Sequence, residues 1–201
     1  MVENYIFDFG NVLCEFYPDK LTAPYAEDIK IRKTISDVVF DRLYWDRLDD
    51  GTISHEEVKI EAKKRLSPEM YESACKVIDN WVRNLVPVEG MQQLISDIKK
   101  TGKKLYLLSN ISIEFTKDYK NVLWIKELFD DFDGLVFSGP IGLVKPKKEI
   151  FTYLLEKYDL KKEECLFIDD SIKNINGAEE CGIKGYLFDG DSEKLREYIQ
   201  L

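Results

Sequence analysis

The sequence of 201 residues is poor in the residue types that several kinds of site require. It contains one histidine, His55, which excludes a two-histidine metal site and confines any histidine acid–base chemistry to that residue. The four cysteines are scattered and form no C-x-x-C pair, and the chain opens without a basic segment followed by a long apolar run. These absences favour a reduced, soluble, cytoplasmic protein.

Long apolar runs and excess positive charge are also missing. No apolar stretch approaches the roughly 20 residues that a membrane-spanning helix needs, so we expect no membrane association. The 29 lysines and arginines face 38 aspartates and glutamates, and the net charge of −9 repels polyphosphate backbones. A nucleic-acid partner is therefore not expected. Hydrophobic residues make up 44% of the chain, enough for a domain with a full core and a small insertion.

Five short apolar runs are typical of strands that are buried on both faces, because they are nearly continuous rather than alternating. The later four are separated by helical patterns. A further helical pattern precedes the second strand; it runs from Met91 to Ile98 with helical spacing and is closed by Gly102. Strands alternating with helices predict an α/β fold with a parallel sheet and right-handed crossovers. The five predicted strands are residues 5–9, 104–109, 135–138, 165–168 and 185–188.

The interval between the first two predicted strands is much longer than one crossover helix requires. It contains no convincing strand but several helical stretches, and Ser54 with Glu57 forms a capping-box pattern. We predict a small all-helical cap, residues 16–84, inserted after the first strand of a core made of residues 1–15 and 85–201. The helices expected in the cap run over residues 29–40, 54–66 and 68–82.

Polar side chains follow the predicted strands at the points where they end, which is where open parallel sheets bind ligands. Each has an ordinary explanation when taken alone, such as a turn, a helix cap or a surface lysine. Asp8 is the exception, because a nearly isolated charge within an apolar run is costly unless it serves a function. Their joint occurrence at one sheet edge favours a functional site. The residues are Asp8, Ser109, Asn110, Lys145, Asp169 and Asp170.

Four ordered segments carry a resemblance to a known family. FDFGNVL (residues 7–13), LLSNIS (107–112), GLVKPKKEIF (142–151) and FIDDSIKNINGAEECGI (167–183) resemble the four motifs of the haloacid dehalogenase superfamily. The helical insertion resembles the cap of that superfamily in its most common position. The resemblance implies a Rossmann-like core and a magnesium-dependent phosphatase that works through an aspartyl-phosphate.

The acidic residues fit this expectation chemically. The reference pKa of aspartate is about 3.9, so Asp8 is an anionic nucleophile at neutral pH if a cation screens it from the phosphate. Magnesium prefers oxygen ligands. The expected metal ligands are Asp8, the backbone carbonyl of Gly10, Asp169 and Asp170.

The remaining motif residues have the donors that a phosphoryl group needs. We expect Ser109 and Asn110 to bind its oxygens, and Lys145 to act with Asp8 in catalysis by stabilising the charge of the transferring group. Lys145 is also expected to pair with Asp8 and the acidic loop in the resting protein. Asn174 either supports the acidic loop or is exposed to solvent.

The sequence departs from the family pattern at Gly10. Most phosphatases of the superfamily carry there a second aspartate, two residues after the nucleophile, which protonates the leaving group and later activates water. The resulting DxGNV motif resembles a subset that includes sugar-1-phosphate phosphatases, whose less basic leaving groups depend less on an acid. Small phosphate monoesters are the expected substrates, and sugar phosphates are the hypothesis for their class.

Two other functions stay open. One is a metal-independent 2-haloacid dehalogenase, which the adjacent acids Asp169 and Asp170 argue against. The other is a non-catalytic phosphometabolite-binding homologue that lost turnover with the second aspartate. The sequence does not distinguish a monomer from a homodimer. Within the cap, the candidates for substrate contact are Trp45, Arg47, His55 and Tyr17, each of which has a simpler structural explanation.

Overall fold

The computed structural model describes all 201 residues, and its centre is a five-stranded parallel sheet in the order β5-β4-β1-β6-β7. Tyr5 pairs with Leu105 of one neighbouring strand and with Leu166 of the other, so β1 lies in the middle. The strands are β1 (Asn4–Phe7), β4 (Lys104–Ser109), β5 (Gly134–Phe137), β6 (Cys165–Asp169) and β7 (Lys184–Leu187). The predicted α/β fold with a parallel sheet is confirmed.

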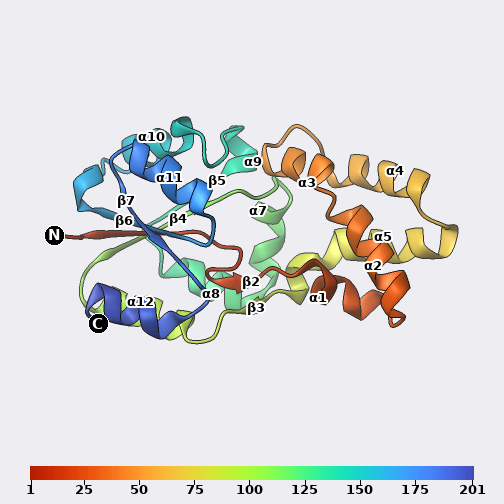
Figure 1. The fold of residues 1–201 in the computed structure, drawn as a ribbon, viewed down its shortest axis with the longest axis horizontal. Helices are drawn as coiled ribbons and strands as arrows, with labels where there is room; N and C mark the ends of the chain where they lie inside the picture. The colour runs from red at the N-terminus through yellow and green to blue at the C-terminus, as the bar shows by residue number, and fades with distance from the viewer.

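Helices cover both faces of this sheet, which explains why the strand sequences are continuously apolar (Figure 1). Phe7 points to the larger hydrophobic cluster and Ile6 to the smaller one on the opposite face. The larger cluster includes residues of α6 (Met91–Lys100), α8 (Leu123–Asp130) and α12 (Ser192–Ile199). The smaller one includes residues of α10 (Lys148–Lys157) and α11 (Ile172–Glu180).

Between β1 and β4 the chain forms a helical lobe to one side of the sheet (Figure 1). Its helices are α1 (Pro18–Thr22), α2 (Ile29–Val39), α3 (Arg42–Asp49), α4 (His55–Arg65) and α5 (Pro68–Asn80), with short 3₁₀ turns at Ala23–Tyr25 and Trp81–Asn84. The expected helices within residues 29–40, 54–66 and 68–82 are present. The division into core and cap at residues 16 and 84 stays a prediction, and we use the name cap for residues 16–84.

A small ribbon joins the cap to the sheet. Strands β2 (Cys14–Glu15) and β3 (Val86–Pro87) pair antiparallel, Cys14 with Pro87 and Glu15 with Val86. The sequence did not predict this ribbon, because two residues are too few to show the alternation of a strand. The ribbon pairs the segment that enters the cap with the segment that leaves it.

Aromatic packing holds the interior of the cap together. The ring of Trp45 lies 4.6 Å from that of Phe40, 5.6 Å from that of Trp81 and 5.9 Å from that of Phe16, measured between centroids. Such edge and tilted contacts are the favourable geometries for aromatic pairs. The predicted capping box at Ser54 and Glu57 is present at the start of α4 and fixes where that helix begins.

Two short helices and two 3₁₀ turns complete the connections: α7 (Phe115–Asp118), α9 (Ser138–Ile141), and the turns at Tyr119–Asn121 and Lys162–Glu164. The α9 helix contacts α3, so it is one place where the sheet lobe meets the cap. None of the helices combines the length and apolar character that a bilayer crossing requires.

Candidate functional site

The carboxyl ends of the three central strands bring the predicted polar residues together. Asp8 follows β1 directly, and its backbone N–H donates to the Ile168 carbonyl of β6 at 2.9 Å. Ser109 is the last residue of β4, and Asp169 is the last residue of β6. Because these strands are adjacent and parallel, residues far apart in the sequence meet at one edge of the sheet.

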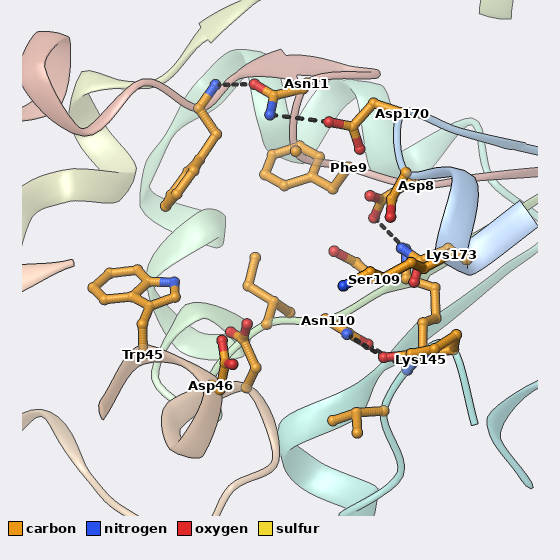
Figure 2. A pocket seen from close by; sticks show the side chains of 18 of the residues that line it. Asp8, Phe9, Asn11, Trp45, Asp46, Ser109, Asn110, Lys145, Asp170 and Lys173 are labelled. Carbon is orange, nitrogen blue, oxygen red and sulfur yellow. Dashed lines mark hydrogen bonds and ion pairs between the residues drawn. The ribbon is translucent and has the colours of Figure 1, made fainter. Parts of the chain in front are cut away.

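Lys145 is the central contact of this edge. Its Nζ lies 2.7 Å from Asp8 Oδ1 (Figure 2). The same Nζ lies 2.7 Å from Asp169 Oδ2, and the Lys145 side chain is almost fully buried. Burial alone would lower the pKa of Lys145, but the Asp8 and Asp169 carboxylates outweigh it and the net shift is upward. The predicted pairing of Lys145 with Asp8 and the acidic loop is confirmed.

The surroundings favour the charged form of Lys145 but disfavour the charged form of Asp8. Burial raises the pKa of Asp8 to about 7, with Lys145 lowering it and Asp169 raising it. A single lysine therefore faces two buried carboxylates, with a third acid, Asp170, beside them. A second positive charge at this place would favour the ionised form of Asp8.

Asp169 is held by the helix that follows it. Its Oδ1 accepts from the Ser171 backbone N–H at 2.8 Å and from Asn174 Nδ2 at 3.0 Å, while Oδ2 accepts from Lys145. Asn174 thus supports the acidic loop rather than lying free in solvent. With both oxygens bonded, the Asp169 carboxylate is fixed in orientation.

Asp8, Asp169 and Asp170 each offer a carboxylate oxygen, and these three oxygens lie within 4.8 Å of one another. The Gly10 carbonyl oxygen accepts no hydrogen bond from the turn around it. An all-oxygen donor set of this kind suits a hard divalent cation such as magnesium. The residues present therefore fit the predicted metal site.

Asn11 was not among the predicted site residues, but it ties this site to the cap. Its Nδ2 donates to Asp170 Oδ2 at 3.2 Å, and its Oδ1 accepts from the Phe16 N–H at 3.0 Å (Figure 2). Its backbone has φ of 56°, a left-handed conformation that asparagine tolerates better than most residues. The Gly-Asn pair in the first motif is the sequence signal that could have indicated this turn.

The two predicted phosphate-binding residues differ in their contacts. The Asn110 side chain brackets the backbone of Lys145, donating from Nδ2 to its carbonyl at 3.0 Å and accepting its N–H at Oδ1 at 2.8 Å. The structure thus gives Asn110 a part in positioning Lys145. The hydroxyl of Ser109 lines the open space and makes no hydrogen bond within the protein, so it is free to donate to a ligand.

A cavity of about 490 Å³ lies between this edge and the cap. We call its two sides the core wall and the cap wall; Figure 2 shows Trp45 and Asp46 of the cap wall across the open space from Asp8 and Asp170 of the core wall. The core wall includes Asp8, Gly10, Asn11, Ser109, Asn110, Lys145, Asp170 and Lys173. The cap wall consists of Phe16, Arg42, Trp45, Asp46, Asp49 and Trp81.

Of the four cap residues suggested by the sequence, only one lines the cavity. Trp45 is buried in the aromatic cluster and also lines the cavity, whereas Arg47, His55 and Tyr17 do not line it. His55 is buried, not solvated as a first-turn residue would be, and its backbone N–H donates to Glu114 Oε1 at 3.1 Å. Burial lowers the pKa of His55.

Most of the cap wall was not predicted. Arg42, Asp46 and Asp49 line the cavity from the cap, but charged residues on amphipathic helices carry no sign of which cavity they face. Lys173 of the core wall was not predicted either. Asp46 Oδ1 lies 2.9 Å from Arg42 Nη2, both side chains being more than half exposed. Asp49 is buried, and burial raises its pKa to about 7.

Comparisons with known proteins agree with this arrangement. The family model described as haloacid dehalogenase-like hydrolase matches residues 2–182. A D-ribitol-5-phosphate phosphatase of Bacteroides thetaiotaomicron is 26% identical over 92% of this chain and 91% of its own length. A sesquiterpene phosphatase of Aspergillus oryzae is 24% identical over 90% of this chain and 86% of its own length.

Another relative, a drimenol cyclase of Aspergillus calidoustus, is 26% identical over the whole of this chain, which spans only 37% of that protein. Among solved structures, a haloacid dehalogenase family enzyme of Bacteroides thetaiotaomicron, crystallised with magnesium and inorganic phosphate, superposes with a TM-score of 0.72. The alignment covers 97% of this chain and 99% of that one at 20% identity, so it is a likeness of fold.

Proposed function

The chain belongs to the haloacid dehalogenase-like hydrolases, and from that premise we propose that it hydrolyses small phosphate monoesters through an aspartyl-phosphate on Asp8. The observation that carries the proposal is the contact of Lys145 with both Asp8 and Asp169 at the core wall of a capped cavity. A buried carboxylate held against a buried lysine, with one face open to a cavity, is suited to attack an electrophile bound there.

Magnesium is the cofactor of this proposal. Asp8, Asp169, Asp170 and the Gly10 carbonyl would hold it, in agreement with the all-oxygen donor set. A bound Mg²⁺ supplies positive charge that offsets the negative charge of a phosphoryl group. Without such a charge, one lysine has to balance three neighbouring carboxylates.

The residues of the core wall have distinct parts in the proposed reaction. The Asp8 carboxylate attacks phosphorus in line with the departing oxygen, and Lys145 stabilises the charge on the transferring group. Ser109 donates its free hydroxyl to a phosphoryl oxygen. Asn110 keeps Lys145 in place and has a second Nδ2 hydrogen for the phosphate. Water then hydrolyses the aspartyl-phosphate.

The cap wall supports an organic substrate with both polar and apolar parts. Phe16, Trp45 and Trp81 present aromatic surface, and Arg42, Asp46 and Asp49 present charge. Aromatic faces combined with carboxylates can bind the C–H and O–H groups of a sugar or polyol. The relatives act, by their names, on a polyol phosphate and on a sesquiterpene. We therefore place sugar or polyol phosphates first and terpenoid phosphates second.

The proposal also includes a location in the cell and a preference over the alternative dehalogenase reaction. All four cysteines are free thiols, which is consistent with a reducing, cytoplasmic location. The metal-independent dehalogenase is disfavoured because that reaction gives no purpose to three carboxylates gathered within 4.8 Å.

A screen of phosphate monoesters with Mg²⁺ tests the proposal, using wild type and Asp8→Asn. We expect the substitution to lower kcat by on the order of 10⁴-fold or more, because it removes the nucleophile. Asp97→Asn is the control, since Asp97 pairs with Lys100 and Arg196 away from the cavity, and its activity should equal that of wild type. Equal residual activity in wild type and Asp8→Asn would refute the aspartyl-phosphate mechanism. Chloride release from 2-chloropropionate in EDTA, without phosphatase activity, would identify a dehalogenase.

A further inference from the structure

The proposed reaction lacks a group for two proton transfers. A leaving alcohol needs a proton when its bond to phosphorus breaks, and the water that attacks the aspartyl-phosphate must lose one. Position 10 holds a glycine, so the core wall has no side chain at the place where the family pattern has an aspartate. Lys145 is committed to two carboxylates, and Asn110 is committed to the backbone of Lys145.

The cap wall contributes two carboxyl groups, and only one of them is withheld from solvent. Asp46 is paired with Arg42 and is more than half exposed. The Asp49 residue is only 9% exposed, and its carboxyl group forms no hydrogen bond or salt bridge with another protein group. Burying an unpaired carboxyl group is unfavourable, so such a group indicates either a function or a neutral, protonated state.

The backbone around Asp49 is bonded to the core next to Ser109 and Asn110, the proposed phosphate-binding residues. The Ser138 hydroxyl, fully buried, donates to the Asp49 carbonyl, while Ser138 Oγ accepts from the Ile111 N–H at 2.8 Å. Ile111 follows Ser109 and Asn110 directly. One serine therefore joins the end of α3 to the segment that carries the proposed phosphate donors.

A close approach of two glycines reinforces this joint. Gly51 has φ of 74°, and a Cβ atom added to it would lie 2.2 Å from the Gly139 carbonyl oxygen. Gly139 in turn donates its N–H to the Ile111 carbonyl at 3.0 Å. The turn after α3 is thus pressed against α9, which holds Asp49 at a constant position relative to the core wall.

From this geometry we propose that Asp49, supplied by the cap, is the general acid and base of the reaction and replaces the aspartate that is missing at position 10. The inference rests on the proposed phosphatase function.

The charges around Asp49 suit the role. Burial raises its pKa to about 7; on its own helix Arg42 lowers the pKa and Asp46 raises it, and across the cavity Asp8 raises it and Lys145 lowers it. An acid with a pKa near 7 is present in both protonation states at neutral pH, which is the best condition for giving a proton and taking one back.

The two steps balance as follows. Asp8 Oδ forms a bond to phosphorus while the bond from phosphorus to the substrate oxygen breaks, and the Asp49 carboxyl proton passes to that oxygen to release an alcohol. Water oxygen then bonds to phosphorus while the Asp8 bond breaks, and the Asp49 carboxylate takes a proton from the water. Inorganic phosphate leaves, and Asp8 and Asp49 return to their starting states.

The test compares an alkyl phosphate with p-nitrophenyl phosphate, whose leaving group needs no proton. In Asp49→Asn we expect kcat for the alkyl phosphate to fall by about 10²- to 10⁴-fold. With p-nitrophenyl phosphate the same variant should give a rapid burst of nitrophenolate, close to one per active site, followed by slow turnover, because only the second step then lacks its base. A loss of burst and turnover in equal proportion would overturn the proposal.

Asp46→Asn is the matched control, since it removes the same charge from the same helix. The ratio of kcat between the two substrates should stay at the wild-type value, whatever happens to KM. If Asp46→Asn changes that ratio as Asp49→Asn does, the effect belongs to the charge of the cap and the assignment to Asp49 is wrong.

A rescue variant separates chemistry from structure. A Cβ atom at Gly10 would lie 3.7 Å from Phe16 Cβ, the nearest atom beyond the adjacent residues, so the backbone there has room for a side chain to begin, as in Gly10→Asp. We expect Gly10→Asp with Asp49→Asn to recover at least about tenfold of the lost alkyl phosphatase rate by restoring an acid to the core wall. No recovery in a folded double variant would count against the role.

The wild type alone supplies a test that needs no substitution. Its kcat/KM for the alkyl phosphate should show a basic limb with an apparent pKa near 7 that is missing from the burst rate with p-nitrophenyl phosphate. The same limb for both substrates would contradict the inference. A wild type inactive on every phosphate ester would instead refute the proposed function, whereas an active wild type matched by Asp49→Asn would refute only the role of Asp49.

Discussion

The core wall and the cap wall of the cavity differ in how their polar groups are held. On the core wall, Lys145 has two carboxylate partners and Asn110 has two contacts with the Lys145 backbone. On the cap wall, Asp46 makes one exposed ion pair, and the Asp49 carboxyl forms no hydrogen bond or ion pair with another protein group. The contrast indicates that the core wall is prearranged to bind the phosphate group that all substrates share. The polar groups of the cap wall remain available to bind the rest of the substrate and to transfer protons.

The largest expected difference between the walls is in stability. Lys145→Met leaves Asp8 and Asp169 buried without their cation, and we expect it to lower the free energy of unfolding by about 3–5 kcal/mol without metal. Arg42→Met breaks the exposed pair with Asp46 and should cost less than about 1 kcal/mol. Urea unfolding at neutral pH measures both. Comparable losses would mean that the core wall is no more preorganised than the cap wall.

The second-largest expected difference between the two walls is in their contribution to Mg²⁺ affinity. Asp169→Asn removes one of the three clustered carboxylates, and we expect the Kd for Mg²⁺ to rise by about 100-fold or more. Asp46→Asn, in the cap, should leave that Kd within about twofold. Isothermal titration with Mg²⁺ alone gives both values. Weakening of both variants to the same degree would place the cation between the walls instead of on the core wall.

The pH dependence of stability tests whether Asp49 is as isolated as its contacts suggest. Burial raises its folded-state pKa from 3.8 to about 7, so its stabilising contribution is complete below about pH 4 and is lost as the pH rises through 7. Asp49→Asn lacks this loss. Without metal, its Tm should exceed the wild-type Tm at about pH 8, and the excess should shrink toward about pH 4. A constant difference across that range would show that Asp49 titrates normally.

The smallest effect is expected from the aromatic part of the cap wall. Trp45→Phe keeps a ring in the cluster but reduces the surface offered to substrate, so KM should rise by about two- to tenfold with kcat retained. Trp124→Phe is the control, because Trp124 lies in α8 and does not line the cavity. A fall in kcat without a change in KM would indicate that Trp45 acts by positioning the cap.

The same contrast explains what the sequence could predict. Parallel strands bring their carboxyl ends to one edge, so the meeting of Asp8, Ser109 and Asp169 follows from topology once the strands are identified, and all five strands were. The Lys145 contacts followed from charge. The roles assigned to these residues stay predictions.

The cap wall was not predictable in the same way. Which side of α3 faces the cavity depends on how the whole cap rests on the core, and that is set by contacts such as Ser138 with the Asp49 carbonyl and Gly51 with Gly139. These pairs are far apart in the sequence and have no motif. The ribbon of β2 and β3 was not predicted for a different reason, because each strand has only two residues.

The central claim is that Asp8 becomes covalently phosphorylated. Acid quenching within the first turnover of wild-type protein with Mg²⁺ and p-nitrophenyl phosphate, followed by mass spectrometry of the peptide that contains Asp8, tests it directly. We predict the added mass of one phosphoryl group on Asp8, and none in Asp8→Asn. Full release of phosphate in a single turnover with no phosphoryl group on the protein at any time, or with that group on another residue, would contradict the account.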